Sequence, residues 1–410
     1  MLLGSGASQC AGVPGIAGIT QQVLSGENVI KQGSDFRLVN PADFREPFTA
    51  QVKNVVGFVN DLEWECNRYF DAIKDKDRKA NYEDVAYVAQ QIEDALTSEY
   101  ENPALYPLIE RLSGQAQRTH DDLRELAADA VHYTKDTVTQ LLSRPLGSLD
   151  YLLPILDAFR DERVAPLDLF TLNHDLVMET ALRAADVMFS DGFDRPYGSL
   201  SIWNDHYPAP SRKLFKLHGS LDWFRYQLKD ARGREEVVAR TPPGGDPVHA
   251  VGPSGELLEV PDGPSILMGT FNKILSYPTG IYADQHFRFH EALRAVDRLI
   301  VIGYGFRDKA INARLVAWIE ERRPRTLVVM HRDPEVLLET QARGQSATSG
   351  GGGKKLVCCT SSTAISTEAS PGRTSTPSSA EVAPTFDPGR PANFRAGTWS
   401  RDGSRLLKAE

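Results

Sequence analysis

Cysteine pairs and long apolar runs are what this chain of 410 residues lacks. It has four cysteines, and none of them forms a CxxC pair, so a disulfide scaffold and a zinc ribbon are excluded and a reduced, cytoplasmic location is expected. No stretch of 18 apolar residues occurs, which argues against a membrane-spanning helix. The opening MLLGSGAS also lacks the basic and apolar regions of a secretory signal.

Positive charge is scarce as well. The chain has 46 Lys and Arg against 55 Asp and Glu, a net charge of −9. From Ser346 onward eight basic residues face five acidic ones, so this end carries +3 and the preceding part carries −12. Nucleic-acid surfaces normally present a basic face, and direct nucleic-acid binding is therefore not expected.

The composition changes near Gly344. Residues 345–410 are rich in Ser, Thr, Gly and Pro, and such segments bury too little apolar area to offset the entropy of ordering the backbone. We predict a disordered, low-complexity tail. Its last part, TWSRDGSRLLKAE, fits one weak hairpin.

Residues 51–163 have a helical pattern. Valine, isoleucine and leucine recur at steps of three and four residues in two runs, Val52 to Leu62 and Val85 to Leu96. The run from Thr119 through Leu142 lacks Pro and Gly and predicts one long helix. This part is therefore predicted to be a large helical insertion.

Residues 1–50 and 164–344 are predicted to form one α/β domain. Five short apolar runs are typical of strands buried on both faces: LDLFTLN, RKLFKLHG, SILMG, DRLIVIGYG and RTLVVMHRD. Helical segments lie between them, at Asp175–Met188, Ala283–Ala295 and Ile311–Arg322. Alternating strands and helices indicate an α/β, Rossmann-like, doubly wound parallel sheet.

Ligands of such sheets bind at the carboxyl ends of the strands, and four motifs stand there. The first is Gly4-Ser5-Gly6-Ala7-Ser8, followed by Gly12-Val13-Pro14. Small residues after a strand let backbone N–H groups approach a pyrophosphate. By itself this motif fits a flexible glycine-rich terminus equally well.

The second and third motifs are Asn173-His174-Asp175 and His218-Gly219-Ser220. Asn and Asp at a strand–helix junction are also common helix caps. A histidine that closes a buried strand is a candidate general base because imidazole titrates near neutrality, although a structural histidine fits as well.

The fourth motif is Gly303-Tyr304-Gly305-Phe306, followed by Asp308 and Asn312. Glycines at the end of a strand would admit a nucleotide close to the backbone. The alternative is an ordinary turn in which Asp308 caps the next helix.

Taken in order, GSGAS with GVP, TLNHD, HGS and GYGF resemble the Sir2 (sirtuin) superfamily. The segment Thr270–Gly305 is similar to its prokaryotic SIR2-like branch. The resemblance covers about residues 1–335, with the helical part as an insertion.

The resemblance implies NAD as the substrate and two catalytic residues. Asn173 would orient the attacking group beside the nicotinamide ribose, and His218 would act as a base toward a ribose hydroxyl. Asp175 would lie near the carboxamide pocket. His174 replaces a residue that is usually apolar in deacetylating sirtuins, so a different nicotinamide pocket is expected.

The remaining residues that the resemblance implies would bind NAD. The glycine turn would hold the pyrophosphate, and other residues would contact the nucleotide or line its adenosine side. They are Gly4, Gly6, Ala7, Ser8, Gly219, Ser220, Gly303, Gly305 and Asn312.

The chain differs from deacetylating sirtuins in two respects. The chain lacks the two CxxC pairs of the structural zinc in deacetylating sirtuins, and Asp-Phe-Arg does not follow Gly12-Val13-Pro14. We therefore expect a zinc-free NAD glycohydrolase, a gated effector that depletes NAD in antiphage defence by abortive infection. A protein deacylase or ADP-ribosyltransferase and a non-catalytic nucleotide sensor are the alternatives.

The resemblance also implies partners. A homo-oligomer is expected, as is control by a partner protein of a defence system, such as an ATPase or a nuclease-like guide-binding protein. No membrane association is expected.

Overall fold

The computed structural model describes residues 1–40, 50–73, 78–98, 102–161, 163, 167–208, 212–230, 233–260, 263–269, 272–321, 325–332, 355–359, 398–399 and 405–406. The chain forms two compact units, Met1–Arg294 and Ala295–Glu410. Each unit has parallel strands of its own.

The first unit contains four parallel strands in the order β1-β4-β8-β5. They are β1 (Leu2–Leu3), β4 (Asp168–Thr171), β8 (Arg212–Lys216) and β5 (Phe189–Ser190). Phe170 and Phe215 stack across the β4–β8 pair with ring centroids 4.5 Å apart, and Phe289 of α9 (Gly280–Ala295) packs 5.0 Å from Phe170. The apolar runs are continuous because helices such as α9 cover the sheet.

The first unit also contains shorter helical elements. They are α1 (Ile16–Ser25), α6 (Leu153–Arg160), α7 (Val177–Ala184), α8 (Asn272–Ser276) and the 3₁₀ turns Ser5–Ala7, Gln9–Ala11, Pro103–Leu105 and Asp150–Leu152. The first helix thus begins only at Ile16, after two 3₁₀ turns, and not directly behind the glycine motif.

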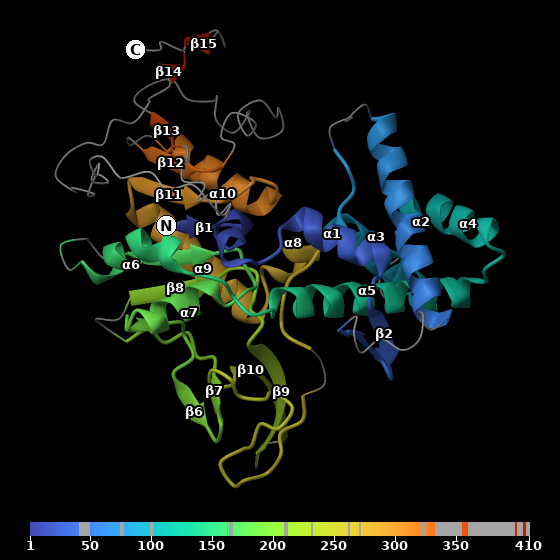
Figure 1. Cartoon of the computed structure of the whole chain (residues 1–410), viewed down its shortest axis with the longest axis horizontal. Coiled ribbons are helices and arrows are strands. Elements are labelled where there is room, and N and C mark those ends of the chain that lie inside the picture. Colours follow the sequence, from blue (N-terminus) through green and yellow to red (C-terminus); the bar gives the residue numbers. More distant parts are fainter. Residues whose placement is uncertain are drawn as a thin grey trace, which may run out of the picture. The chain divides into compact units, whose positions relative to one another are not determined.

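The predicted helices of the insertion are confirmed, and they lie side by side (Figure 1). We call them the helical block: α2 (Ala50–Ala72), α3 (Tyr82–Leu96), α4 (Tyr106–Gln115) and α5 (His120–Leu142). Helix α5 begins directly after Thr119, where Thr119 and Asp122 form a reciprocal capping box, and it ends at Leu142 as predicted.

The N-terminal hairpin packs on the helical block. It consists of β2 (Val29–Gln32) and β3 (Asp35–Leu38). The amide of Gln140 in α5 donates to the Phe36 carbonyl and accepts from the Leu38 N–H, at 2.7 and 2.8 Å. A side chain of α5 therefore satisfies backbone hydrogen-bonding groups at the outer edge of β3.

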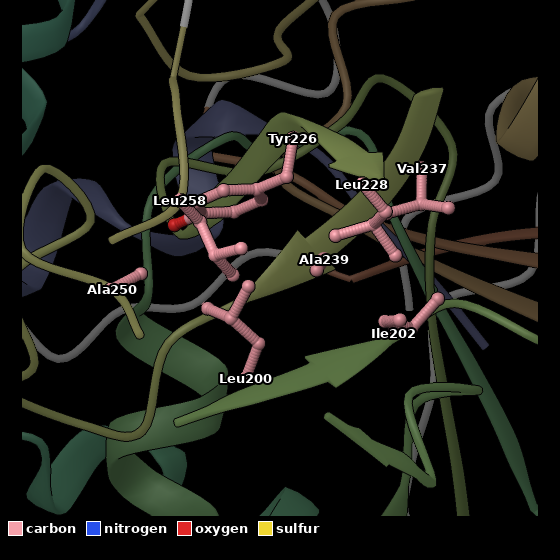
Figure 2. Packing of buried hydrophobic residues seen from close by; sticks show 8 residues of the cluster. All are labelled: Leu200, Ile202, Tyr226, Leu228, Val237, Ala239, Ala250 and Leu258. Atoms are coloured by element: carbon pink, nitrogen blue, oxygen red, sulfur yellow. The ribbon is translucent and has the colours of Figure 1, made fainter. Parts of the chain in front are cut away.

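A four-stranded antiparallel sheet was not predicted. It has the order β6-β7-β10-β9 and is formed by β6 (Arg195–Tyr197), β7 (Leu200–Ile202), β10 (Gly233–Arg240) and β9 (Trp223–Asp230). Figure 2 shows its apolar cluster, in which Tyr226 of β9 lies beside Leu258 from the loop after β10, and Leu228 lies beside Val237 of β10. This sheet has a small core of its own.

One predicted strand is wrong. The apolar run Ser265–Gly269 forms no strand, and it contributes only an isolated bridge between Ile266 and Gly219. Leu267 of this run is buried where the run crosses the turn after β8, and the run does not join the sheet.

The second unit is a short α/β arrangement with the strand order β13-β12-β11, all parallel. Its elements are β11 (Arg298–Ile302), α10 (Lys309–Glu320), β12 (Thr326–Met330) and β13 (Lys355–Cys359). Parallel strands with flanking helices in both units confirm the predicted α/β, Rossmann-like class.

The strand β13 lies inside the segment predicted as a disordered tail. Its sequence, KLVCC, is a short apolar run able to extend the ladder of β12. The weak hairpin is present as β14 (Thr398–Trp399) and β15 (Arg405–Leu406), which pair antiparallel. The prediction for the rest of 345–410 falls outside the described residues.

Candidate functional site

Three of the four motifs meet at one edge of the first unit. Leu3 pairs with Thr171, and Thr171 pairs with Lys216, so the carboxyl ends of β1, β4 and β8 lie level with one another. The glycine turn, the Asn-His-Asp segment and the His-Gly-Ser segment continue from these ends. This is the edge at which parallel sheets bind ligands.

Asn173 joins the first two motifs. Its side-chain Nδ2 donates to the Gly4 carbonyl at 3.0 Å and to the Ser8 hydroxyl at 2.9 Å. Both Asn173 and Ser8 are buried. The amide is thus held in one orientation by the glycine turn, and it does not cap a helix.

The glycine turn uses part of its own backbone. The N–H groups of Ala7 and Ser8 donate to the carbonyls of Gly4 and Ser5, at 2.9 and 3.1 Å. A pyrophosphate at this turn would have to take its hydrogen bonds from other donors. Tyr151 also holds the turn, because its hydroxyl donates to the Ala7 carbonyl at 2.7 Å.

Asp175 has a local partner. Its Oδ1 accepts from the Val177 N–H at 3.1 Å, at the start of α7. Leu176 occupies the cap position of α7, so Asp175 bonds to the start of this helix without being its N-cap.

His218 lies just beyond β8 and is buried. Its Nε2 is 2.9 Å from the hydroxyl of Tyr277, and the two rings stack with an interplanar angle of 11°. Tyr277 also packs against His286 of α9, with ring centroids 3.8 Å apart. A small buried aromatic group therefore surrounds the candidate base.

Gly219 and Ser220 hold the turn after His218. Gly219 has a φ of +87°, and a Cβ there would lie 2.1 Å from the Ser265 carbonyl oxygen, so only glycine fits. The same carbonyl accepts from the Ser220 N–H, and the His218 carbonyl accepts from the Leu267 N–H at 2.8 Å.

A buried ion pair lies beneath the site. The Lys216 ammonium donates to Glu179 Oε1 at 2.8 Å and to the carbonyls of His174 and Asp175. Burial raises the pKa of Glu179, and the Lys216 charge opposes that change. Lys216 therefore connects β8, α7 and the Asn-His-Asp segment.

A second ion pair connects the site to the helical block. Lys273 of α8 donates to Glu83 of α3 at 2.8 Å, and its side chain is 8% exposed. The Lys273 carbonyl accepts from the Tyr277 N–H at 3.1 Å. The residue that contacts His218 is thus one turn away from a residue held by the helical block.

The fourth motif belongs to the second unit. Asp308 caps α10 by accepting from two backbone N–H groups, as the alternative interpretation proposed. Asn312 holds the turn with both side-chain atoms, since it accepts from the Tyr304 hydroxyl and donates to the Phe306 carbonyl, each at 2.8 Å. The roles proposed for Gly303, Gly305 and Asn312 toward NAD remain predictions.

Sequence reasoning missed the residues that support the site. Lys216 had a detectable signal, a charged residue inside a buried strand two positions before His218. Tyr277, Lys273 and His286 had none, because their place in the site depends on long-range packing.

Two features are absent from the described residues. No group of three or more His, Cys, Asp or Glu side chains in that part of the chain is placed to hold a metal ion. None of its helices has both the length and the apolar character that a membrane crossing requires. No protein-family model matches the chain, and no curated protein matches it.

Proposed function

We propose that this chain is an NAD glycohydrolase of the SIR2-like kind. The observation that carries the proposal is the direct bond of Asn173 to Gly4 and Ser8, with His218 at the neighbouring strand end. Residues more than 160 positions apart in the sequence thus meet at the ligand-binding edge of a parallel sheet. Their order and identities are those of the Sir2-like motifs.

The proposed reaction breaks the bond between nicotinamide and C1′ of the ribose. Water adds to C1′ and loses a proton, so NAD and water give ADP-ribose, nicotinamide and H⁺. The transition state is oxocarbenium-like and needs an oriented acceptor, a positioned base and an enclosed pocket. Asn173 would orient the water, and His218 would polarise a ribose hydroxyl.

The Tyr277 hydroxyl marks where that ribose hydroxyl would bind. It is 2.9 Å from His218 Nε2, the distance at which a base contacts a hydroxyl in catalysis. On this proposal the substrate hydroxyl replaces the tyrosine hydroxyl when NAD binds.

The test is release of ADP-ribose and nicotinamide from NAD by the full chain, with Asn173→Ala and His218→Ala as inactivating variants. We expect each variant to lose about 10²- to 10⁴-fold in rate. Absence of turnover by the wild type, alone and with co-purified partners, would refute the proposal. Label transfer from NAD to protein, or deacylation of a peptide, would replace it with the transferase or deacylase alternative.

We further propose that the helical block gates the site through Glu83 and Lys273. Because this ion pair holds α8, and with it Tyr277, its loss should free His218. Glu83→Gln is expected to raise NAD turnover about fivefold, as the loss of about 1 kcal/mol predicts. Glu125→Gln, an exposed change on α5, is the control and should leave the rate unchanged. An equal rate in both variants would contradict the gate.

The biological role proposed is depletion of NAD in phage-infected bacterial cells. It would be tested by measuring cellular NAD and phage yield in bacteria that express the wild type or Asn173→Ala. A wild-type chain that neither lowers NAD nor protects the culture would refute this role.

A further inference from the structure

Lys216 is a charged residue at a position of β8 where an apolar side chain is the rule. It is 2% exposed and lies two positions before His218. Successive residues of a strand point to opposite faces of a sheet. Phe215 stacks on Phe170 at the face that α9 covers. Lys216 therefore points to the other face, where its ammonium donates to Glu179 of α7 at 2.8 Å.

The ammonium also binds the backbone that follows Asn173. It donates to the His174 carbonyl at 3.4 Å and to the Asp175 carbonyl at 2.5 Å. The hydrogen-bond ladder of α7 begins one residue later, where the Leu176 carbonyl accepts from the Thr180 N–H. Both carbonyls thus precede the helix, and a side chain from the neighbouring strand supplies the donor that a helix would otherwise supply.

Asn173 is fixed on three sides. Its side-chain amide donates to Gly4 and Ser8 of the glycine turn. Its N–H donates to the Thr171 hydroxyl at 3.1 Å. The backbone after it is held by Lys216. The third restraint differs from the others because it depends on a buried charge.

A buried ammonium is a costly way to hold two carbonyls. Taking such a charge out of water is strongly unfavourable, and an apolar pair of similar volume often packs equally well or better. Glu179 offsets part of this cost as the counter-ion. Stability alone therefore does not account for the pair, whereas holding the backbone beside a reacting group in one geometry does.

The neighbouring histidine is neutral, which is compatible with these contacts. Burial, followed by the nearby positive groups, holds the pKa of His174 well below its usual range; those groups are Lys273, His218 and Lys216. An imidazolium at this position would repel the ammonium that binds the carbonyl of the same residue. The ammonium of Lys216 is therefore the charge that this part of the site keeps.

We propose that Lys216 is a positioning residue for Asn173. Its ammonium, with Glu179 as the counter-ion, fixes the two following carbonyls and thereby the direction of the Asn173 amide. This inference rests on the proposed function, in which Asn173 orients the attacking water. Misplacing such a group by about 1 Å costs about 10²-fold in rate. Loss of Lys216 should lower kcat and leave KM nearly unchanged, because the oriented water acts in the transition state.

The decisive variant combines Lys216→Met with Glu179→Leu. It removes both charges and keeps two long apolar side chains, so no unpaired charge is left in the core. Arg240→Met with Asp191→Leu is the matched control, because this ion pair joins β10 to the segment after β5. In NAD hydrolysis by the full chain, we expect kcat to fall about 10- to 100-fold in the first double variant and to stay within about threefold of the wild type in the second. KM should stay within about threefold in both.

Urea unfolding of the same two variants separates positioning from stability. A fall in kcat that exceeds the control at an equal loss of stability supports the inference. If kcat of the Lys216 and Glu179 double variant stays within about threefold of the wild type, or if the control loses as much, the inference is overturned.

Amide-resolved hydrogen exchange separates this inference from the proposed function. The Leu221 N–H donates to the His174 carbonyl at 3.0 Å, and the Val177 N–H donates to Asp175 Oδ1 at 3.1 Å. We expect both amides to exchange about tenfold faster in the Lys216→Met double variant, and at the wild-type rate in the control. If the wild type hydrolyses no NAD but shows this pattern, the fixing of the backbone by the ammonium stands while the glycohydrolase proposal fails. Unchanged exchange would overturn the inference.

Discussion

Replacing Gly219 by alanine should both destabilise the chain and inactivate the site. At a φ of +87° an alanine costs about 1–2 kcal/mol. Its Cβ would also lie 2.1 Å from the Ser265 carbonyl, so the segment Ser265–Leu267 must move away. This movement breaks two hydrogen bonds, from Ser220 to Ser265 and from Leu267 to His218, each worth about 0.5–1.5 kcal/mol.

The free energy of unfolding should therefore fall by about 2–5 kcal/mol in Gly219→Ala. Gly255→Ala is the matched control, because Gly255 has a φ of +83° and nothing within 4 Å of an added Cβ. It should lose only the backbone part, about 1–2 kcal/mol. Urea unfolding of both variants measures the difference, and NAD turnover should fall only in Gly219→Ala. Equal destabilisation of the two would refute the argument from the Ser265 contact.

Three further predictions concern the buried groups. Lys216→Met should lower the free energy of unfolding by about 3–5 kcal/mol because Glu179 is left unpaired, and adding Glu179→Leu should recover part of that loss in urea unfolding. Because the pKa of His174 is lowered in the folded chain, the unfolded chain takes up a proton below pH 6.5 that the folded chain does not. The neutral His174 therefore contributes fully to the free energy of unfolding above pH 6.5. As the pH falls below 6.5, this contribution is lost at about 1.4 kcal/mol per pH unit. Urea unfolding at pH 7.5 and 5.5 should show this extra loss in the wild type and not in His174→Gln. Tyr277→Phe should lower the KM for NAD by about two- to twelvefold, since the substrate no longer displaces a hydrogen bond on His218, and a large fall in kcat would contradict this.

Elements whose sequence pattern and local signals agree were predictable. Helix α5 has no Pro or Gly, and Thr119 and Asp122 cap it. The continuous apolar runs of β4, β8, β11 and β12 indicated parallel strands, which the structure contains. The pairing of β9 with β10 was missed, although only two residues separate Trp223–Asp230 from Gly233–Arg240 in the sequence. The run Ser265–Gly269 was misassigned because burial alone does not distinguish a strand from a crossing loop.

Some residues of the candidate site were predictable from the sequence, and others were not. Asn173 and His218 were found because their strands end beside them. Asp175 bonds to the start of α7, although Leu176 and not Asp175 occupies the cap position. Tyr277 and Lys273 lie in the segment Thr270–Gly305, whose resemblance assigned them no role, and only the folded chain connects them to the site.

The pairing of β1 with β4 has a consequence for how the chain folds. Leu2 must pair with Phe170 before Asn173 can bond to Gly4. Formation of the site therefore closes one of the longest loops in the first unit. The helices within that loop make mostly local contacts, which form fast. If the helical block folds first, it shortens the free loop from about 170 to about 75 residues and lowers the entropic cost of closing it by about 0.7 kcal/mol. Deleting the helical block is therefore expected to change the refolding rate, and restoring the chain length with a flexible linker should slow the formation of the site.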